Sequence, residues 1–182
     1  MPYPNRSTFF TLVLFALTGG WILAGCQFTL SENQSDRFSR LDSNLTQLQN
    51  SLNTVPGDSL SYFAEQIAAE LIQLKSSFRD TTDTLFISED LPQYQEAQHY
   101  FNHLSSTLPV LQKDISFSKS QLEALLQDVE KGKIKPEQID QFLSDEEKIT
   151  TDLIARGNDF KTILQSALNR YFSIQPKVEE RL

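Results

Sequence analysis

Cysteine is almost absent from this sequence, because Cys26 is the only one among 182 residues. No intramolecular disulfide can form without a second thiol, so the apolar core must hold the fold. The chain has only two histidines, His99 and His103, and six glycines, which form no glycine-rich phosphate-binding loop. No pattern places a nucleophile beside a histidine base and an orienting carboxylate. We therefore expect a protein that is not an enzyme and has no cofactor.

Basic residues are outnumbered by acidic ones, at 16 against 24, and the net charge is -8. A basic face is needed to bind a phosphate backbone, and a polybasic patch is needed to adsorb to anionic lipid. We therefore expect no nucleic-acid partner, and attachment to a membrane would need another feature.

The sequence has one long apolar run, which lies at the N-terminus, and none after residue 30. The segment MPYPNR, with the charge of Arg6, precedes the uncharged stretch STFFTLVLFALTGGWILAG. A charged start, an apolar run and small residues at its end are the layout of a secretory signal. A membrane-spanning anchor is the alternative, but the run from Thr8 to Ala24 covers about 17 residues, the short limit for crossing a bilayer.

The end of this run, Leu23-Ala24-Gly25-Cys26, resembles the lipobox of bacterial lipoproteins at all four positions. The resemblance covers the first 26 residues. It implies that a peptidase cuts between Gly25 and Cys26 and that the Cys26 sulfur carries a diacylglyceryl group. Residues 1–25 would be the signal peptide, and residues 26–33 a lipidated tether whose acyl chains anchor the protein in a membrane.

The residue after the cysteine is informative within the same resemblance. In Gram-negative lipoproteins an aspartate there often marks retention in the inner membrane, whereas this chain has Gln27. The resemblance therefore implies a lipid-anchored protein of the cell envelope, at the periplasmic face of the outer membrane.

After Ser31, apolar residues recur at alternating steps of three and four, which is the period of amphipathic helices. The pattern predicts four long helices, at about 31–55, 58–78, 91–115 and 136–172, with Pro109 kinking the third. A capping box from Ser120 to Glu123 predicts a separate short helix that ends at Gly132. The expected inward-facing residues are Phe38, Leu41, Leu45, Leu48, Leu52, Val55, Leu60, Phe63, Ile67, Leu71, Leu74, Phe78, Tyr94, Ala97, Phe101, Leu104, Leu108, Leu111, Ile115, Leu122, Leu125, Leu126, Val129, Ile139, Phe142, Leu143, Ile149, Leu153, Phe160, Leu164, Leu168 and Tyr171.

The fold class expected from these helices is all-α. Connections by tight turns predict antiparallel neighbours, hence an elongated up-and-down bundle over residues 34–175 with coiled-coil-like heptads. Residues 176–182 would be a frayed C-terminal tail. The irregular segment 79–92 would place Leu85, Phe86 and Ile87 over the end of the bundle or offer them to a partner.

One group of residues has the types and spacing of metal ligands. Glu96, His99 and His103 stand at i, i+3 and i+7 on the third helix and so share a face. The Glu-x-x-His pair resembles half of the motif of ferritin-like di-iron bundles, but the sequence has no second pair. These residues also lie opposite the apolar stripe. We therefore expect a solvated polar face without a metal.

Two classes of function stay open at this point. The first is a membrane-anchored, non-enzymatic structural or interaction module, whose partner is another envelope protein or a second copy of the chain. The second is a lipoprotein that binds a ligand in a bundle cavity, or a metal at the face of Glu96, His99 and His103.

Overall fold

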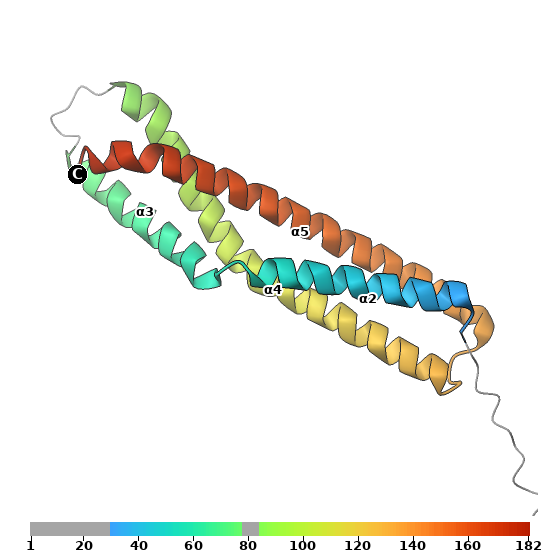
Figure 1. Cartoon of the computed structure of the whole chain (residues 1–182). Coiled ribbons are helices and arrows are strands. Elements are labelled where there is room, and N and C mark those ends of the chain that lie inside the picture. Colours follow the sequence, from blue (N-terminus) through green and yellow to red (C-terminus); the bar gives the residue numbers. More distant parts are fainter. Residues whose placement is uncertain (1–29, 78–83) are drawn as a thin grey trace, which may run out of the picture.

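The computed structural model describes residues 30–77 and 84–182, and this part of the chain is all-α, as predicted (Figure 1). Cys26, its signal segment and Phe78 lie outside the described residues. The elements in chain order are α2 (Glu32–Asn53), α3 (Gly57–Ser77), the π-helical turn η1 (Phe86–Asp90), α4 (Leu91–Glu130) and α5 (Pro136–Glu179). No helix in the described ranges is both long enough and apolar enough to span a bilayer.

The helices form an elongated bundle in which α4 and α5 run almost the whole length (Figure 1). The main packed pairs are α4 with α5, α3 with α4, and α2 with both α4 and α5. α3 continues in the direction of α2 instead of folding back beside it (Figure 1). The reversal expected between the first two helices therefore does not occur, and α2 and α3 pack against different stretches of α4 (Figure 1).

Most residues predicted to face inward form one continuous core. All five apolar residues of the α2 stripe from Phe38 to Leu52 are buried. All seven of the α4 stripe from Tyr94 to Ile115 are buried as well. The three-and-four spacing thus identified the packed faces of these helices, including the stretch of α4 that passes through Pro109.

Local signals set the ends of the helices. The Ser31 hydroxyl accepts from the Gln34 amide and the Gln34 side chain accepts from the Ser31 amide, both at 3.2 Å, so a capping box opens α2. Just after the C-terminal end of α4, Gly132 takes a positive φ of 65°. The amides of Gly132 and Lys133 donate to the carbonyls of Val129 and Asp128, which is a Schellman motif.

The separate short helix at 120–131 is a wrong prediction, because α4 is continuous to Glu130. The Ser120 hydroxyl donates to the carbonyl of Ser116, at 3.1 Å, instead of capping a new helix. Ser118, Leu122 and Val129 are buried and continue the stripe beyond Ile115 in phase. Because the buried face continues without a break, packing against the rest of the bundle stabilises the helix beyond Ile115.

The frayed tail at 176–182 is also wrong, because α5 passes through Pro176 and ends at Glu179. Ile174 and Val178 are buried. The ammonium group of Lys177 lies 2.7 Å from the Asp90 carboxylate at the end of η1. These contacts with a segment distant in sequence hold the last turns in place.

The described part of the segment 79–92 is helical from residue 84 onward, and not irregular as expected. Phe86 is buried under the Arg181 guanidinium, 4.3 Å from its ring centre, while Leu85 and Ile87 are exposed. Only one of the three apolar residues therefore closes the end of the bundle.

α2 and α5 approach each other closely at Gly157. A Cβ atom there would stand 2.4 Å from the Leu48 Cδ1. Gly157 is buried within α5, so the missing side chain is what makes room for α2.

Candidate functional site

The three residues of α4 that have the types and spacing of metal ligands, Glu96, His99 and His103, are not gathered into a ligand cluster in the structure. Glu96 accepts a hydrogen bond from the Tyr100 hydroxyl at 2.7 Å and pairs with Arg170 of α5 at 2.8 Å. His99 and His103 are exposed. No cluster of three potential metal-ligating side chains occurs in the ranges that the structure describes. Glu96 therefore ties α4 to α5.

A second polar group lies in the α3 half of the rod. The Tyr94 hydroxyl donates to Glu70, and the Gln66 amide donates to the same carboxylate at 3.0 Å. Burial, followed by the hydrogen bond to Glu70, raises the pKa of Tyr94 far above its ordinary value. Burial likewise raises the pKa of Tyr171, whose ring stacks on Tyr94 at 6.0 Å. Both phenols stay protonated near neutral pH, and the hydrogen bond from Tyr94 to Glu70 links α4 to α3.

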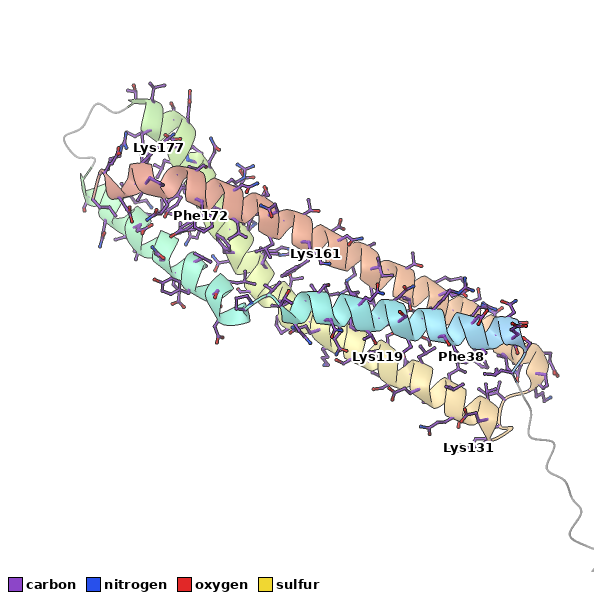
Figure 2. The ribbon with its side chains drawn as sticks, in the orientation of Figure 1. Phe38, Lys119, Lys131, Lys161, Phe172 and Lys177 are labelled. Carbon is purple, nitrogen blue, oxygen red and sulfur yellow. The ribbon has the colours of Figure 1, made fainter. Side chains whose placement is uncertain are left out.

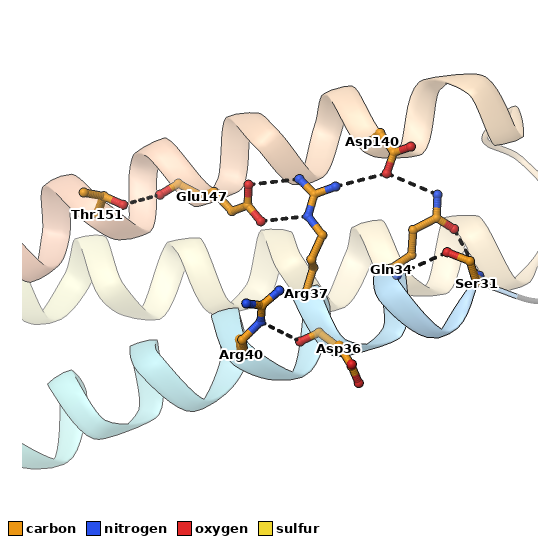
Figure 3. A network of polar contacts seen from close by, with 8 residues as sticks. All are labelled: Ser31, Gln34, Asp36, Arg37, Arg40, Asp140, Glu147 and Thr151. Atoms are coloured by element: carbon orange, nitrogen blue, oxygen red, sulfur yellow. Dashed lines mark hydrogen bonds and ion pairs between the residues drawn. The ribbon is translucent and has the colours of Figure 1, made fainter.

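The first turns of α2 are clamped to α5 by Arg37 (Figure 3). Its guanidinium donates to both carboxylate oxygens of Glu147, at 2.7 and 2.9 Å, and to Asp140 at 3.0 Å. The hydrogen bond to Arg37 holds the pKa of Glu147 below its usual range. Glu147 is the last of three consecutive acidic residues, Asp145, Glu146 and Glu147. This acidic run contributes one residue to a bidentate ion pair.

A groove between α4 and α5 is the best candidate for binding. It has a volume of about 480 Å³ and lies in the half of the rod that contains α2, yet only α4 and α5 line it. We call it the α4–α5 groove, and its lining residues are Asp114, Phe117, Ser118, Gln121, Lys148, Ile149, Asp152, Leu153 and Arg156.

Apolar side chains stand exposed at this groove. Phe117 is 62% exposed and Ile149 is 41% exposed. Phe142 and Val110 stand seven residues from them along the same helices, and they are exposed too. A fourth helix would cover this side in a four-helix bundle, but among the described residues only α2, α4 and α5 pack together in this half of the rod. Ser118 lines the groove with a buried hydroxyl that has no hydrogen-bond partner among the described residues.

The rim of the groove carries both signs of charge. The Arg156 guanidinium lies 2.8 Å from Asp114 across the groove and 3.8 Å from Asp152 on its own helix. Lys148 pairs with Asp145 at 3.0 Å. Hydrogen bonds from Gln141 and then Lys148 lower the pKa of Asp145, so this carboxylate stays ionised. A balanced charged rim around an apolar centre is the usual build of a protein-binding surface.

Sequence reasoning missed this groove. Phe142 and Ile149 were expected to face inward, and both are 41% exposed. Phe117 and Val110 lie off the apolar stripe of α4, seven residues apart. Two apolar residues at that interval outside the core stripe were the available signal.

The predicted lipidation residue Cys26 and the cleavage position after Gly25 lie outside the described residues. No family model matches the sequence, and neither a curated protein nor a solved structure matches it.

Proposed function

We propose that this chain is a lipid-anchored protein of the cell envelope that acts as a non-enzymatic interaction module. Support for the anchor comes from Leu23-Ala24-Gly25-Cys26 and from the short stretch of sequence, five residues, between Cys26 and the start of α2 at Glu32. The acyl chains on Cys26 would hold the rod at the periplasmic face of the outer membrane.

The observation that carries the interaction role is the pair of exposed apolar residues, Phe117 and Ile149, in the α4–α5 groove. Apolar side chains grouped in a groove with a polar rim mark contact surfaces. The groove lies between two helices, so it suits an amphipathic helix that presents an apolar stripe flanked by charges of both signs. Such a helix would take the place of a fourth member of an antiparallel, coiled-coil-like bundle, whose seams follow the three-and-four spacing of the core residues.

The anchor is tested by the intact mass of the protein extracted from membranes. The expected species begins at Cys26 and carries acyl chains. Cys26→Ser should abolish the lipid mass and leave the signal segment uncleaved. A wild-type chain that begins elsewhere, without lipid, would overturn the proposed anchor.

The docking role is tested by a photo-crosslinking amino acid at position 117 in living cells. The matched control carries the same probe at position 172, because Phe172 is also aromatic, is 60% exposed, and lies in the other half of the rod (Figure 2). We expect a discrete protein adduct from position 117 and none from position 172. Absence of any adduct at position 117 would refute the docking role.

A further inference from the structure

The structure points to a second copy of this chain as the occupant of the α4–α5 groove, and we infer that two copies pair through α5 in an antiparallel, two-fold arrangement. This inference rests on the proposed function of the groove as a docking surface. It adds the identity and the direction of the partner helix.

The order of charges along α5 carries the inference. Asp145, Lys148, Ile149, Asp152 and Arg156 follow one another at helical spacing, so they share one side of α5. Their characters in that order are negative, positive, apolar, negative and positive. The reversed order is positive, negative, apolar, positive and negative, so every charge meets its opposite when the helix is placed antiparallel to itself. A parallel pairing in register would place like charges together.

A two-fold axis level with residue 150, one position after Ile149, makes these contacts reciprocal, as a symmetric dimer requires. Lys148 of one copy then lies near Asp152 of the second copy, and Asp145 lies near Arg156 of the second copy. The side chains of Lys148 and Asp152 are 72% and 68% exposed, so both can reach across in addition to their pairs with Asp145 and Arg156 of the same copy. Phe117 lies beside Ile149 in the same groove, and the pairing covers both side chains.

The net charge favours this face over the rest of the surface. The full sequence has a net charge of -8, and cleavage before Cys26 would remove Arg6 and leave -9, so two copies repel each other over most of their area. At the groove, two cations, Lys148 and Arg156, balance two carboxylates, Asp114 and Asp152. The acyl anchors would add to the association, because they confine both copies to one membrane and raise their effective concentration.

The size of the face is adequate for a specific dimer. The α5 stretch from Phe142 to Arg156 is about 21 Å long at 1.5 Å per residue, and two helices side by side are about 20 Å wide. With one further turn at each end, the face covers roughly 600 Å² in projection. This is close to the roughly 800 Å² of accessible surface that each partner buries in a standard interface.

The test uses the acylated full-length protein, purified in detergent, and measures its dimer dissociation constant by analytical ultracentrifugation. We expect wild type to dimerise at micromolar concentrations and Lys148→Glu to weaken the dimer at least tenfold, because the new carboxylate would face Asp152 of the second copy. The double variant Lys148→Glu/Asp152→Lys exchanges the two charges and should restore the wild-type constant. Lys161→Glu is the matched control, because it reverses a charge on α5 outside the groove and should leave the constant unchanged.

A wild-type protein that stays monomeric would overturn the inference, as would a Lys148→Glu variant that behaves like Lys161→Glu. Failure of the double variant to recover dimerisation would overturn the antiparallel pairing. These outcomes are distinct from failure of the proposed function: an adduct in cells between position 117 and a different protein leaves the docking role intact and rules out the second copy as the occupant. Circular dichroism of each variant checks that its helix content is unchanged.

Discussion

Glu146 and Glu147 are adjacent on α5, but their pKa values are shifted in opposite directions. Glu147 accepts two hydrogen bonds from Arg37, whereas the Oε2 atom of Glu146 is buried without a hydrogen-bond partner among the described residues. Accordingly, the pKa of Glu147 is lowered by Arg37, and the pKa of Glu146 is raised by burial and then by the charge of Asp145. The same residue type therefore stabilises the fold at one position and destabilises it at the next.

Arg37→Lys should lower the free energy of unfolding at pH 7 by about 0.5–1 kcal/mol. Lysine keeps the charge but cannot form the two parallel hydrogen bonds, and Glu147 is 42% exposed, so solvent screens the pair. Because the pKa of Glu147 is lowered in the folded state, the difference from wild type should be full above about pH 5 and should shrink as pH falls through the folded pKa. Urea denaturation, followed by circular dichroism at each pH, measures this difference in unfolding free energy between the variant and wild type. Arg40→Lys should have almost no effect, since lysine keeps the charge that acts on Glu147 and the guanidinium hydrogen bond that it loses is a long one, 3.4 Å from the Asp36 carbonyl.

Glu146→Gln should raise the free energy of unfolding at pH 7 by up to about 1 kcal/mol, because a neutral amide is cheaper to bury than a carboxylate. The folded pKa of Glu146 is raised, so the wild-type penalty exists only where the carboxylate is ionised. The gain should therefore disappear below about pH 4, near the pKa of an unfolded glutamate. Thermal melts at pH 7 and pH 3.5 test this. Glu123→Gln, at an exposed position on α4, is the control; an equal gain there would contradict the role of burial.

At the scale of the helices, the close approach of α2 to α5 depends on Gly157. Alanine would favour an isolated helix by about 1 kcal/mol, but a Cβ 2.4 Å from Leu48 Cδ1 overpacks a buried contact, at a cost of about 1–3 kcal/mol. Gly157→Ala should therefore lower the free energy of unfolding by about 1 kcal/mol.

The effect of Gly157→Ala on the free energy of unfolding should change sign in the Leu48→Ala background. There the alanine methyl fills part of the cavity left by Leu48 and should stabilise the fold by about 1 kcal/mol. A double-mutant cycle in urea gives the coupling energy between the two positions. Equal effects of Gly157→Ala in both backgrounds would show that the two helices do not meet at this residue.

The last turns of α5 are a second feature that belongs to this scale. Val178 is fully buried, so Val178→Ala should cost about 1–2 kcal/mol of unfolding free energy. Leu182 is 51% exposed, and Leu182→Ala should change stability by less than about 0.5 kcal/mol. Thermal melts of the two variants distinguish a packed end from a frayed one, because a frayed end would give two equally small effects.

At the scale of the whole molecule, α4 and α5 run through both halves of the rod. α2 lies in one half and α3 in the other (Figure 1). All tyrosines in the described ranges, Tyr62, Tyr94, Tyr100 and Tyr171, lie in the half that contains α3, so their fluorescence reports on that half alone. Leu45 is buried in the other half, on α2. Leu45→Ala should shift the urea midpoint of tyrosine fluorescence as much as that of circular dichroism, because the two shared helices couple the halves in one transition. An unchanged fluorescence midpoint would mean that the halves unfold separately.

Helical periodicity predicted the buried stripes of α2 and α4, because burial on one side of a helix leaves a direct imprint on residue order. It did not predict that α3 continues along α2, because the short connection between Asn53 and Gly57 does not by itself set the direction of the next helix. It assigned Phe142 and Ile149 to the core because apolar character alone does not say how many neighbours a helix has. The α4–α5 groove lies where no further helix of the described ranges covers α4 and α5, and this depends on how the helices pack together.

The clamp formed by Arg37 has a mechanical consequence. In the proposed lipid-anchored protein, any pull between the membrane and the far end of the rod would enter the fold at the first turn of α2. α2 lies alongside α5 (Figure 1), so this load would act along their shared length and shear the contacts, instead of peeling them apart one after another. The bidentate pair between Arg37 and Glu147 lies in the first turns that receive the load. Single-molecule stretching from the N-terminus should therefore show a lower rupture force for Arg37→Lys than for Arg40→Lys.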